Sequence, residues 1–379
     1  MPLILDGKKY DKIKFDQGES SSLFILSSTD DGSEIVFDYL PKLDSSFNSD
    51  EYEVLLLENS FLNAENDVFT LYERYHNTTS DKCESKRVGW VFPITILESN
   101  ESEHSNNTHL HGYQYVAFEH LLKAKTHINP TIDVRFNQSG KYSLSEIYGE
   151  NTILAVIKKT RVPSPQQFTL QSYIPSLSQY GYFIKNEFEL NHRVDQYKCS
   201  YLELRGKKRL YIRRSDVKLL ENQYFNDLYT QYFKTISNPL LRFHLIYQVI
   251  EHIIGERFDK DFEEIIVKYQ QNKIQKNDFI EEINELKKER TNIRKVFNIY
   301  KSNYNNSGNY LADLKRDCQD ILEKHTEVKD DVGDLVYDVR NLLVHNFRKL
   351  SELEKEKLNQ INMTFELVTS DFLIYGIEN

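Results

Sequence analysis

Short apolar or alternating runs dominate the first 210 residues of the chain. Alternation with period two is typical of half-buried strands, and polar clusters such as Asp30–Ser33 separate the runs as turns do. The runs lie at Leu23–Leu26, Glu34–Tyr39, Glu53–Leu57, Val68–Tyr72, Val88–Ile96, Thr152–Ile157 and Tyr201–Tyr211. Helical periodicity is scarce here, apart from Val116–Ala124. We therefore expect a mostly antiparallel β domain over residues 1–210, built as a sandwich or a barrel-like sheet.

From about residue 215 the pattern changes to the 3.6-residue period of helices, and glycine and proline become rare. The predicted helices span residues 217–235, 239–255, 259–270, 277–303, 309–325, 330–346 and 352–375. Pro239 fits the first turn of the second helix, and Ser351 with Glu354 forms a capping-box pattern at the last. The charged segment Asn277–Asn303 is expected to be long and two-faced, as in a projecting hairpin arm. The predicted fold class is α+β, with a helical bundle over residues 215–379.

The composition favours a folded protein and limits what it can bind. The chain has 379 residues with 25 Tyr and 22 Phe, which argues against disorder, and its net charge is -10. Such an acidic protein must contact nucleic acid through local basic patches. Cys83, Cys199 and Cys318 show no metal-ligand spacing and favour a reducing cytoplasm. The start, Met1–Asp6, lacks the basic region of a signal peptide, no segment is apolar enough to span a membrane, and no cofactor is expected.

A strongly basic segment, Arg205–Arg214, joins the two predicted parts. Lys207, Lys208 and Arg209 could contact phosphates and guide RNA to the bundle, with Tyr211 as a stacking surface. The alternative, which we favour, is a hairpin whose solvated cationic edge protects the strand from aggregation.

Three histidines, His104, His109 and His111, lie in the polar segment Glu98–His111. A metal site is conceivable there, but no acidic or cysteine partner lies at a typical ligand spacing. We therefore predict a long exposed loop and no metal site.

The predicted helix at 330–346 has two unlike faces. The apolar face suits the core and is made of Leu335, Val336, Val339, Leu342 and Leu343. The other face holds Tyr337, Asn341 and His345, with Arg340 at its edge and Val344 inside it. Such a mixed face is better explained if a partner subunit or a substrate packs on it. Arginine holds phosphate in a planar fork and histidine moves protons near neutral pH, which is what cutting RNA without a metal would need.

Arg340 and His345 are five positions apart, so their side chains diverge by about 140° on a regular helix. One chain would not easily direct both at one phosphate, whereas a two-fold dimer would bring two of each into a shared cleft. Asn341 lies one turn before His345 and could fix its ring or bind a phosphate oxygen. The alternative is structural: Arg340 pairs with Asp338 or Glu251, and His345 meets the helix dipole.

The helix Leu240–Ile254 is apolar over most of its circumference. Its polar residues form one stripe at helical spacing: His244, Tyr247, Gln248, Glu251 and His252. A buried helix needs partners for such a stripe, and Glu251 would suit Arg340. The alternative is a stripe that simply faces water.

The motif Arg340-Asn341-Leu342-Leu343-Val344-His345, late in a helical bundle, resembles the Arg-x4-His pattern of the HEPN superfamily. The resemblance covers residues 215–379. It implies a homodimeric, metal-independent endoribonuclease that leaves a 2′,3′-cyclic phosphate and spares DNA. In that family His345 would be the general acid or base, Arg340 would stabilise the phosphate, and Asn341 would support it. Substrate-binding or supporting roles would fall to Tyr337, Glu251, Tyr247 and Arg348.

One position departs from part of this family. In the toxin–antitoxin branch a tyrosine commonly follows the histidine by two residues and is adenylylated, whereas this chain has Phe347. A β-rich half before a HEPN-like half resembles ApeA-type and other abortive-infection proteins of bacterial antiphage defence. A sensing or partner-binding role for residues 1–210, with a phage-derived or protein trigger, rests on this analogy.

Three hypotheses follow from the sequence. The first is a cytoplasmic, dimeric HEPN endoribonuclease of a defence or stress system that cuts RNA, for example tRNA or mRNA. The second is a non-catalytic HEPN-like module that binds a nucleotide or a protein, with Arg340 and His345 serving only the interface. The third is a helical scaffold without a nucleic-acid role.

Overall fold

The chain is α+β, with sheets first and helices after them, as predicted. The computed structural model describes residues 3–5, 8–17, 22–41, 46–59, 67–77, 82–99, 107–123, 141–163, 168–186, 208–215, 222–303 and 308–375. Two compact units are formed by Met1–Val217 with Tyr229–Lys234, and by Lys218–Leu228 with Thr235–Asn379. Tyr229–Lys234 belongs to the first unit because the fully buried Lys234 ammonium pairs with Glu58 at 2.8 Å.

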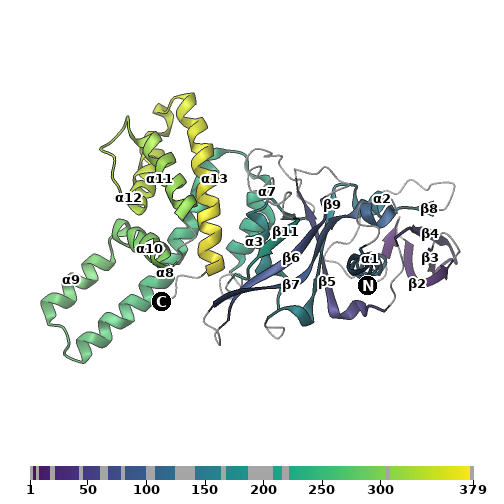
Figure 1. Ribbon diagram of the computed structural model, residues 1–379. Helices are drawn as coiled ribbons and strands as arrows, with labels where there is room; N and C mark the ends of the chain where they lie inside the picture. The colour runs from purple at the N-terminus through teal and green to yellow at the C-terminus, as the bar shows by residue number, and fades with distance from the viewer. Residues whose placement is uncertain are drawn as a thin grey trace. The chain divides into compact units, whose positions relative to one another are not determined.

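Two sheets form the first unit (Figure 1). The five-stranded sheet has the order β1-β2-β3-β4-β8, and the six-stranded sheet has the order β10-β5-β9-β7-β6-β11. The strands are β1 Leu3–Leu5, β2 Lys8–Gln17, β3 Ser22–Ser28, β4 Glu34–Tyr39, β5 Tyr52–Glu58, β6 Phe69–Asn77, β7 Lys82–Pro93, β8 Lys141–Tyr142, β9 Thr152–Lys158, β10 Phe183–Ile184 and β11 Arg209–Ile212. Pairing is antiparallel except that β8 runs parallel to β4 and β11 runs parallel to β6.

Helix α1 (Thr108–Leu122) lies in the core of this unit. Its Phe118 ring packs on Phe24 and Tyr39 of the five-stranded sheet, with centroids 4.9 and 4.8 Å away. The same apolar cluster contains Trp90 and Leu154 of the six-stranded sheet and extends to α2 (Leu144–Tyr148). The opposite face of the six-stranded sheet is covered by α3 (Ile174–Ser178). Helix α1 thus packs on both sheets, which the prediction of a sandwich or a barrel-like sheet did not include. Each large side chain buried there contributes roughly 1.5–3 kcal/mol.

The predicted loop over Glu98–His111 is wrong at its end, because α1 begins at Thr108. His111 is buried, and His109 is exposed in the first turn, where its backbone N–H donates to the Asn107 side chain. His104 lies outside the described residues. The helical period of Val116–Ala124 predicted the second half of α1. Its first half was missed, because it is buried on nearly all sides and lacks a one-sided period. Within the described parts of the chain, no group of three or more His, Cys, Asp or Glu could hold a metal ion.

The second unit is a helical bundle (Figure 1). Its first helix, α6 (Gln223–Asp227), is followed by a π-helical turn at Leu228–Tyr232 and by α7 (Phe233–Thr235), most of which belong to the first unit. The bundle helices are α8 Pro239–Gln270, α9 Lys276–Leu286, α10 Glu289–Asn303, α11 Gly308–Leu322, α12 Val332–Asn346 and α13 Glu352–Tyr375. Helix α13 packs on α8 and α11, and α12 packs on α10 and α11. Among the helices that the structure describes, no apolar stretch is long enough to cross a membrane.

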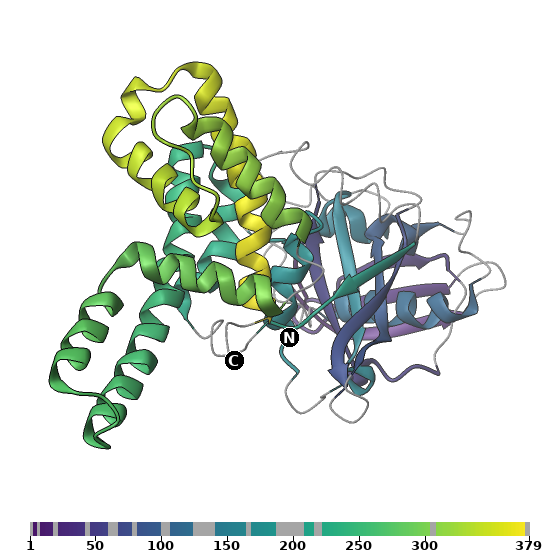
Figure 2. The ribbon, with the colours of Figure 1, turned by 60° about the vertical axis from the view of Figure 1, so that its left-hand side comes forward.

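Two helix boundaries differ from the prediction. The helices expected at 239–255 and 259–270 are one, because Gly255 faces open space and does not interrupt α8. The helix expected at 277–303 is two, because the chain breaks at Lys287 and Lys288. The projecting hairpin is therefore made by the second half of α8 and by α9, as Figure 2 shows. The Tyr269 and Phe279 rings join its two helices, with centroids 4.7 Å apart.

The capping box predicted at the start of α13 is confirmed. The Ser351 backbone N–H donates to the Glu354 carboxylate at 2.8 Å, and the Glu354 N–H donates to Ser351 Oγ at 3.4 Å. The His325 ring contacts the same carboxylate at 2.8 Å. The hydrogen bonds from Ser351, assisted by His325, lower the pKa of Glu354 to about 2.

Glu354→Gln should therefore destabilise the protein most near neutral pH. A carboxylate whose pKa is lower in the folded chain stabilises the fold above its ordinary pKa, and this contribution is lost as the pH falls. For Glu354 the loss runs from 4.5 down to about 2. We expect the difference in thermal midpoint between wild type and Glu354→Gln, measured by circular dichroism, to shrink over this interval. Glu352→Gln, 87% exposed in the same turn, is the control. A difference that does not change with pH would contradict this role.

Candidate active site

An ion network holds α12 against α10. Arg290 of α10 donates to Asp334 and to Asp338 at 2.8 Å each, and Arg294 donates to Asp334 at 2.6 Å. Although burial opposes it, the hydrogen bonds from Arg290 and Arg294 lower the pKa of Asp334. Gly333 permits this close approach, since a Cβ there would lie 2.8 Å from the Arg294 Cα. The network fixes the rotation of α12, and the predicted core face is buried: Leu335, Val336, Val339, Leu342 and Leu343.

Arg340 has no acidic partner in the described part of the chain, where no carboxylate lies within 4.0 Å of its guanidinium. Asp338, one of the two acids considered for it, binds Arg290 and also Lys329 at 3.2 Å. The half-buried guanidinium instead donates to Asn341 Oδ1 at 3.1 Å and lies 5.8 Å from the Tyr247 ring centroid. A positive charge is thus held in place without being neutralised.

The polar stripe of α8 lies beside Arg340 through three of its members. Tyr247 is buried, and its hydroxyl donates to Glu289 of α10 at 2.8 Å. Burial and this hydrogen bond raise the pKa of Tyr247, while Arg340 opposes the shift. Burial, and then the charge of Arg340, lower the pKa of His244. Partial desolvation and the charge of Glu289 raise the pKa of Glu251, and Arg340 again opposes the shift.

The other members of the stripe lie apart from Arg340. The His252 ring meets the Asn222 amide at 2.9 Å and packs on Phe225 at 5.0 Å, so it holds α6 on α8. Gln248 is exposed. Glu289 belongs to the cluster but was missed from the sequence, because it reaches Tyr247 only after the break that precedes α10.

The remaining predicted site residues spread around α12 and its end. Tyr337 lies toward α10, with the Arg290 guanidinium 5.3 Å from its ring centroid. His345, Val344 and Arg348 are exposed. Within the described residues no hydrogen bond joins His345 to Asn341, whose side-chain oxygen accepts from Arg340. One chain therefore assembles the surroundings of Arg340 and leaves His345 open to solvent.

The residues of the basic segment Arg205–Arg214 differ in their structural surroundings. Arg205–Lys207 lie outside the described residues, while Lys208 adopts φ 51 just before β11. Among the described residues β11 pairs in parallel with β6, and the other half of the favoured hairpin lies outside them. Arg214 is structural: its Nε donates to the buried Glu73 at 2.7 Å, and Tyr173 donates to the same carboxylate at 2.8 Å. Lys208 and Arg209 remain exposed.

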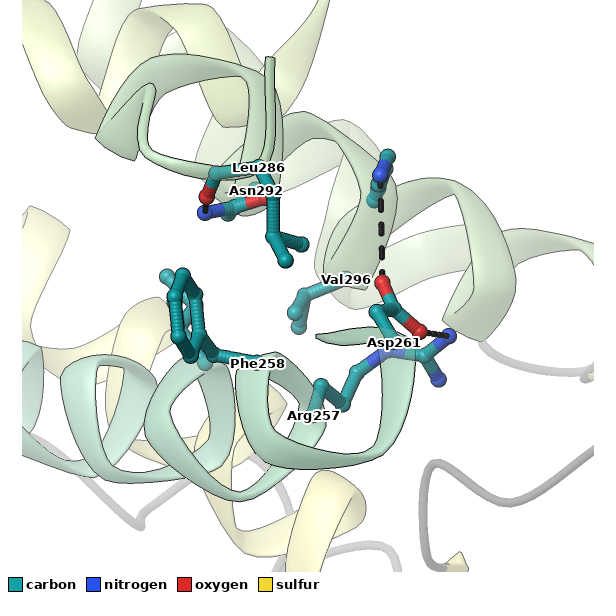
Figure 3. Close-up of a pocket in the computed structure, with 8 residues that line it drawn as sticks. Arg257, Phe258, Asp261, Leu286, Asn292 and Val296 are labelled. Carbon is teal, nitrogen blue, oxygen red and sulfur yellow. Dashed lines mark hydrogen bonds and ion pairs between the residues drawn. The ribbon is translucent and has the colours of Figure 1, made fainter. Parts of the chain in front are cut away.

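A small hollow lies between α8, α10 and the end of α9 (Figure 3). Its acid, Asp261, lies between Arg257 at 3.9 Å and Lys295 at 3.8 Å, and the Asn292 amide donates to the Leu286 carbonyl at 2.7 Å. These polar groups already satisfy one another. The hollow is therefore better explained as the packed base of the hairpin than as a binding site.

No family model, curated protein or solved structure matched the chain when it was compared with each of these three groups. The interpretation of the site accordingly depends on its residues and their geometry.

Arg340→Gln should raise the pKa of His244. Removing a nearby positive charge makes protonation of the imidazole easier, while burial of the ring continues to oppose it. The His244 pKa should therefore move upward but stay below its ordinary value, and the pKa of Glu251 should rise further. A ¹H–¹³C NMR titration of the histidine rings would measure this, with His109 of the other unit as an internal control. An unchanged His244 titration would show that Arg340 does not face it.

Proposed function

We propose that the second unit is a HEPN-like endoribonuclease that acts as a homodimer, with Arg340 and His345 in a composite site. The observation that carries the proposal is the half-buried Arg340 guanidinium, which is held by Tyr247 and Asn341 and lacks a carboxylate partner among the described residues. An arginine fixed in this way can bind a phosphate by donating two hydrogen bonds to its oxygens.

The chemistry assigned to the site is transesterification of an RNA phosphodiester. The 2′-oxygen attacks the phosphorus, the bond to the 5′-oxygen breaks, and the products are a 2′,3′-cyclic phosphate and a free 5′-hydroxyl. His345 would take the proton from the 2′-hydroxyl or give one to the leaving oxygen. Arg340 would stabilise the charge that develops on the phosphate oxygens, and Asn341 would hold the guanidinium in place.

The exposed end of α12 supports a dimer. His345 is exposed, and the apolar Val344 beside it is 49% exposed. A two-fold axis near this end would cover Val344 and bring His345 of one chain toward Arg340 of the other. The composite site would then direct both Arg340 and His345 at one phosphate, which a single helix cannot do.

We place this nuclease in an antiphage or stress response in the cytoplasm, cutting RNA such as tRNA or mRNA. The first unit would recognise a trigger or restrain the nuclease. This part of the proposal rests on the resemblance in domain order and not on a motif in residues 1–210.

A second candidate is a non-catalytic module that binds a nucleotide or a protein. It is favoured by the state of His345, which has no hydrogen-bond partner among the described residues to orient its ring. A catalytic histidine usually has such a partner, at least once substrate is bound.

Purified wild-type protein should cut total RNA in EDTA, and His345→Ala should lower the rate by roughly 10²–10⁴-fold. Arg340→Ala should lower it by roughly 10²–10³-fold. The 3′ ends of the products, tested with a phosphatase that does not open cyclic phosphates, should be 2′,3′-cyclic. His109→Ala removes an exposed histidine from the other unit and should leave the rate unchanged. RNA binding by a wild-type dimer without cleavage would favour the second candidate, and equal cutting by His345→Ala would end the catalytic assignment.

Mixing the two inactive variants should restore part of the activity. In a heterodimer of Arg340→Ala and His345→Ala chains, one composite site keeps both side chains if they come from different subunits. After full subunit exchange we expect about one quarter of the wild-type rate, since half of the dimers are mixed and each has one intact site. Cleavage would be measured after co-refolding. If each site were built from a single chain, mixing would restore nothing.

A further inference from the structure

One face of the six-stranded sheet gathers arginine and tyrosine side chains from β6, β7 and β11, which lie next to one another (Figure 1). Tyr72 of β6 is paired with Arg87 of β7 and with Tyr211 of β11. Paired residues point to the same side of a sheet, as do residues two apart on one strand. Arg74 and Arg209 therefore share this side, and we call the five residues the arginine–tyrosine face.

Four side chains of this face form a continuous stack. The Arg209 guanidinium lies 5.5 Å from the Tyr72 ring centroid, and the Tyr72 and Tyr211 rings lie 5.5 Å apart. The Arg74 guanidinium lies 4.3 Å from the Tyr211 ring centroid. Ring contacts of this kind orient a guanidinium and leave its charge and its N–H donors available.

The positive charge of the face is not compensated locally. Within the described residues no carboxylate lies within 4.0 Å of the guanidinium of Arg74, Arg87 or Arg209. The acids of the same strands alternate to the other side, where Glu73 binds Arg214 and Glu84 accepts from the Tyr75 hydroxyl. In a chain with a net charge of -10, such a surface stands out as a specific site for anions.

We propose that the arginine–tyrosine face binds a single strand of RNA. The pairing places Arg209 beside Thr70 and Arg87 beside Tyr72 of β6, so Arg209, Arg87 and Arg74 advance along the strand direction in steps of two residues, about 6.6 Å each. Their guanidinium groups would therefore contact phosphates of an extended backbone. The Tyr72 and Tyr211 rings lie between Arg209 and Arg74 in the stack, where they can meet sugars and bases. Aromatic residues interleaved with cations on a strand surface are the composition that single-stranded nucleic acids require.

This inference goes beyond the proposed cleavage, because it concerns the first unit and needs no chemistry at Arg340 or His345. It also extends the basic surface beyond the segment predicted from the sequence, by adding Arg74 and Arg87 to Arg209. Arg74 and Arg87 come from strands more than 100 positions earlier than Arg209, and only the parallel pairing of β11 with β6 brings them to it.

The test is RNA binding by the full chain carrying His345→Ala, in EDTA, so that the probe stays intact. Fluorescence anisotropy with a labelled oligouridylate of about 20 nucleotides would report the affinity at several salt concentrations. Adding Arg74→Ala and Arg209→Ala should weaken binding at least about tenfold and reduce the slope of log affinity against log salt by about 1.4, for two lost phosphate contacts. The matched control, Lys12→Ala with Lys14→Ala, removes two exposed cations from β2 and should change neither quantity.

A second pair of variants and a competition experiment complete the binding test. Arg74→Lys with Arg209→Lys keeps the charge and should weaken binding without changing the salt slope, and it supplies the measurement if the alanine pair fails to fold by circular dichroism. Equal loss in the β2 control would overturn the proposal. So would displacement of the probe by polyglutamate as efficiently as by unlabelled oligouridylate, which would indicate an acidic protein partner. Face-dependent binding without any cleavage by wild type would reject only the nuclease proposal.

Discussion

The bridge that Arg290 makes between Asp334 and Asp338 decides the charge of the candidate active site. Asp338 lies two positions before Arg340 and could have neutralised it, but it is bound by Arg290 and Lys329. Asp334 is bound by Arg290 and Arg294. Three cations thus share two carboxylates at the junction of α10 and α12. Neither aspartate is left over for Arg340, and the helix that carries it is fixed in rotation by the same contacts.

A half-buried guanidinium without an acid needs other sources of stabilisation, since desolvating a charge is costly. The Tyr247 ring, the Asn341 side-chain oxygen and the more distant charge of Glu251 provide them. Glu289 in turn accepts from the Tyr247 hydroxyl, which holds the ring in position. The arrangement stabilises Arg340 by dipoles and by charges at a distance. A bound phosphate would therefore find a cation that has not already formed its ion pair.

The sequence was sufficient where a feature depends on local periodicity. The buried face of α12, the polar stripe of α8 and the Ser351 capping box all follow from spacing within one or two turns. It was not sufficient where a feature depends on distant contacts. Glu289 and Tyr247 are 42 positions apart, and their contact requires the helix to break at Lys287 and Lys288. The residue types at this break do not predict it. The first half of α1 was missed for a related reason, since burial on nearly all sides removes the amphipathic pattern by which helices are found.

Two groups of arginines in this chain differ in their partners. Arg214 and Arg242 pair with the buried carboxylates of Glu73 and Glu366, as removing an unpaired charge from water would cost several kcal/mol. Arg340, Arg74 and Arg209 are at least partly exposed and lie beside tyrosine rings instead. A ring orients the cation without cancelling its charge. Positive charge therefore stays available at such positions in this acidic protein, and both proposed RNA contacts are built in this way.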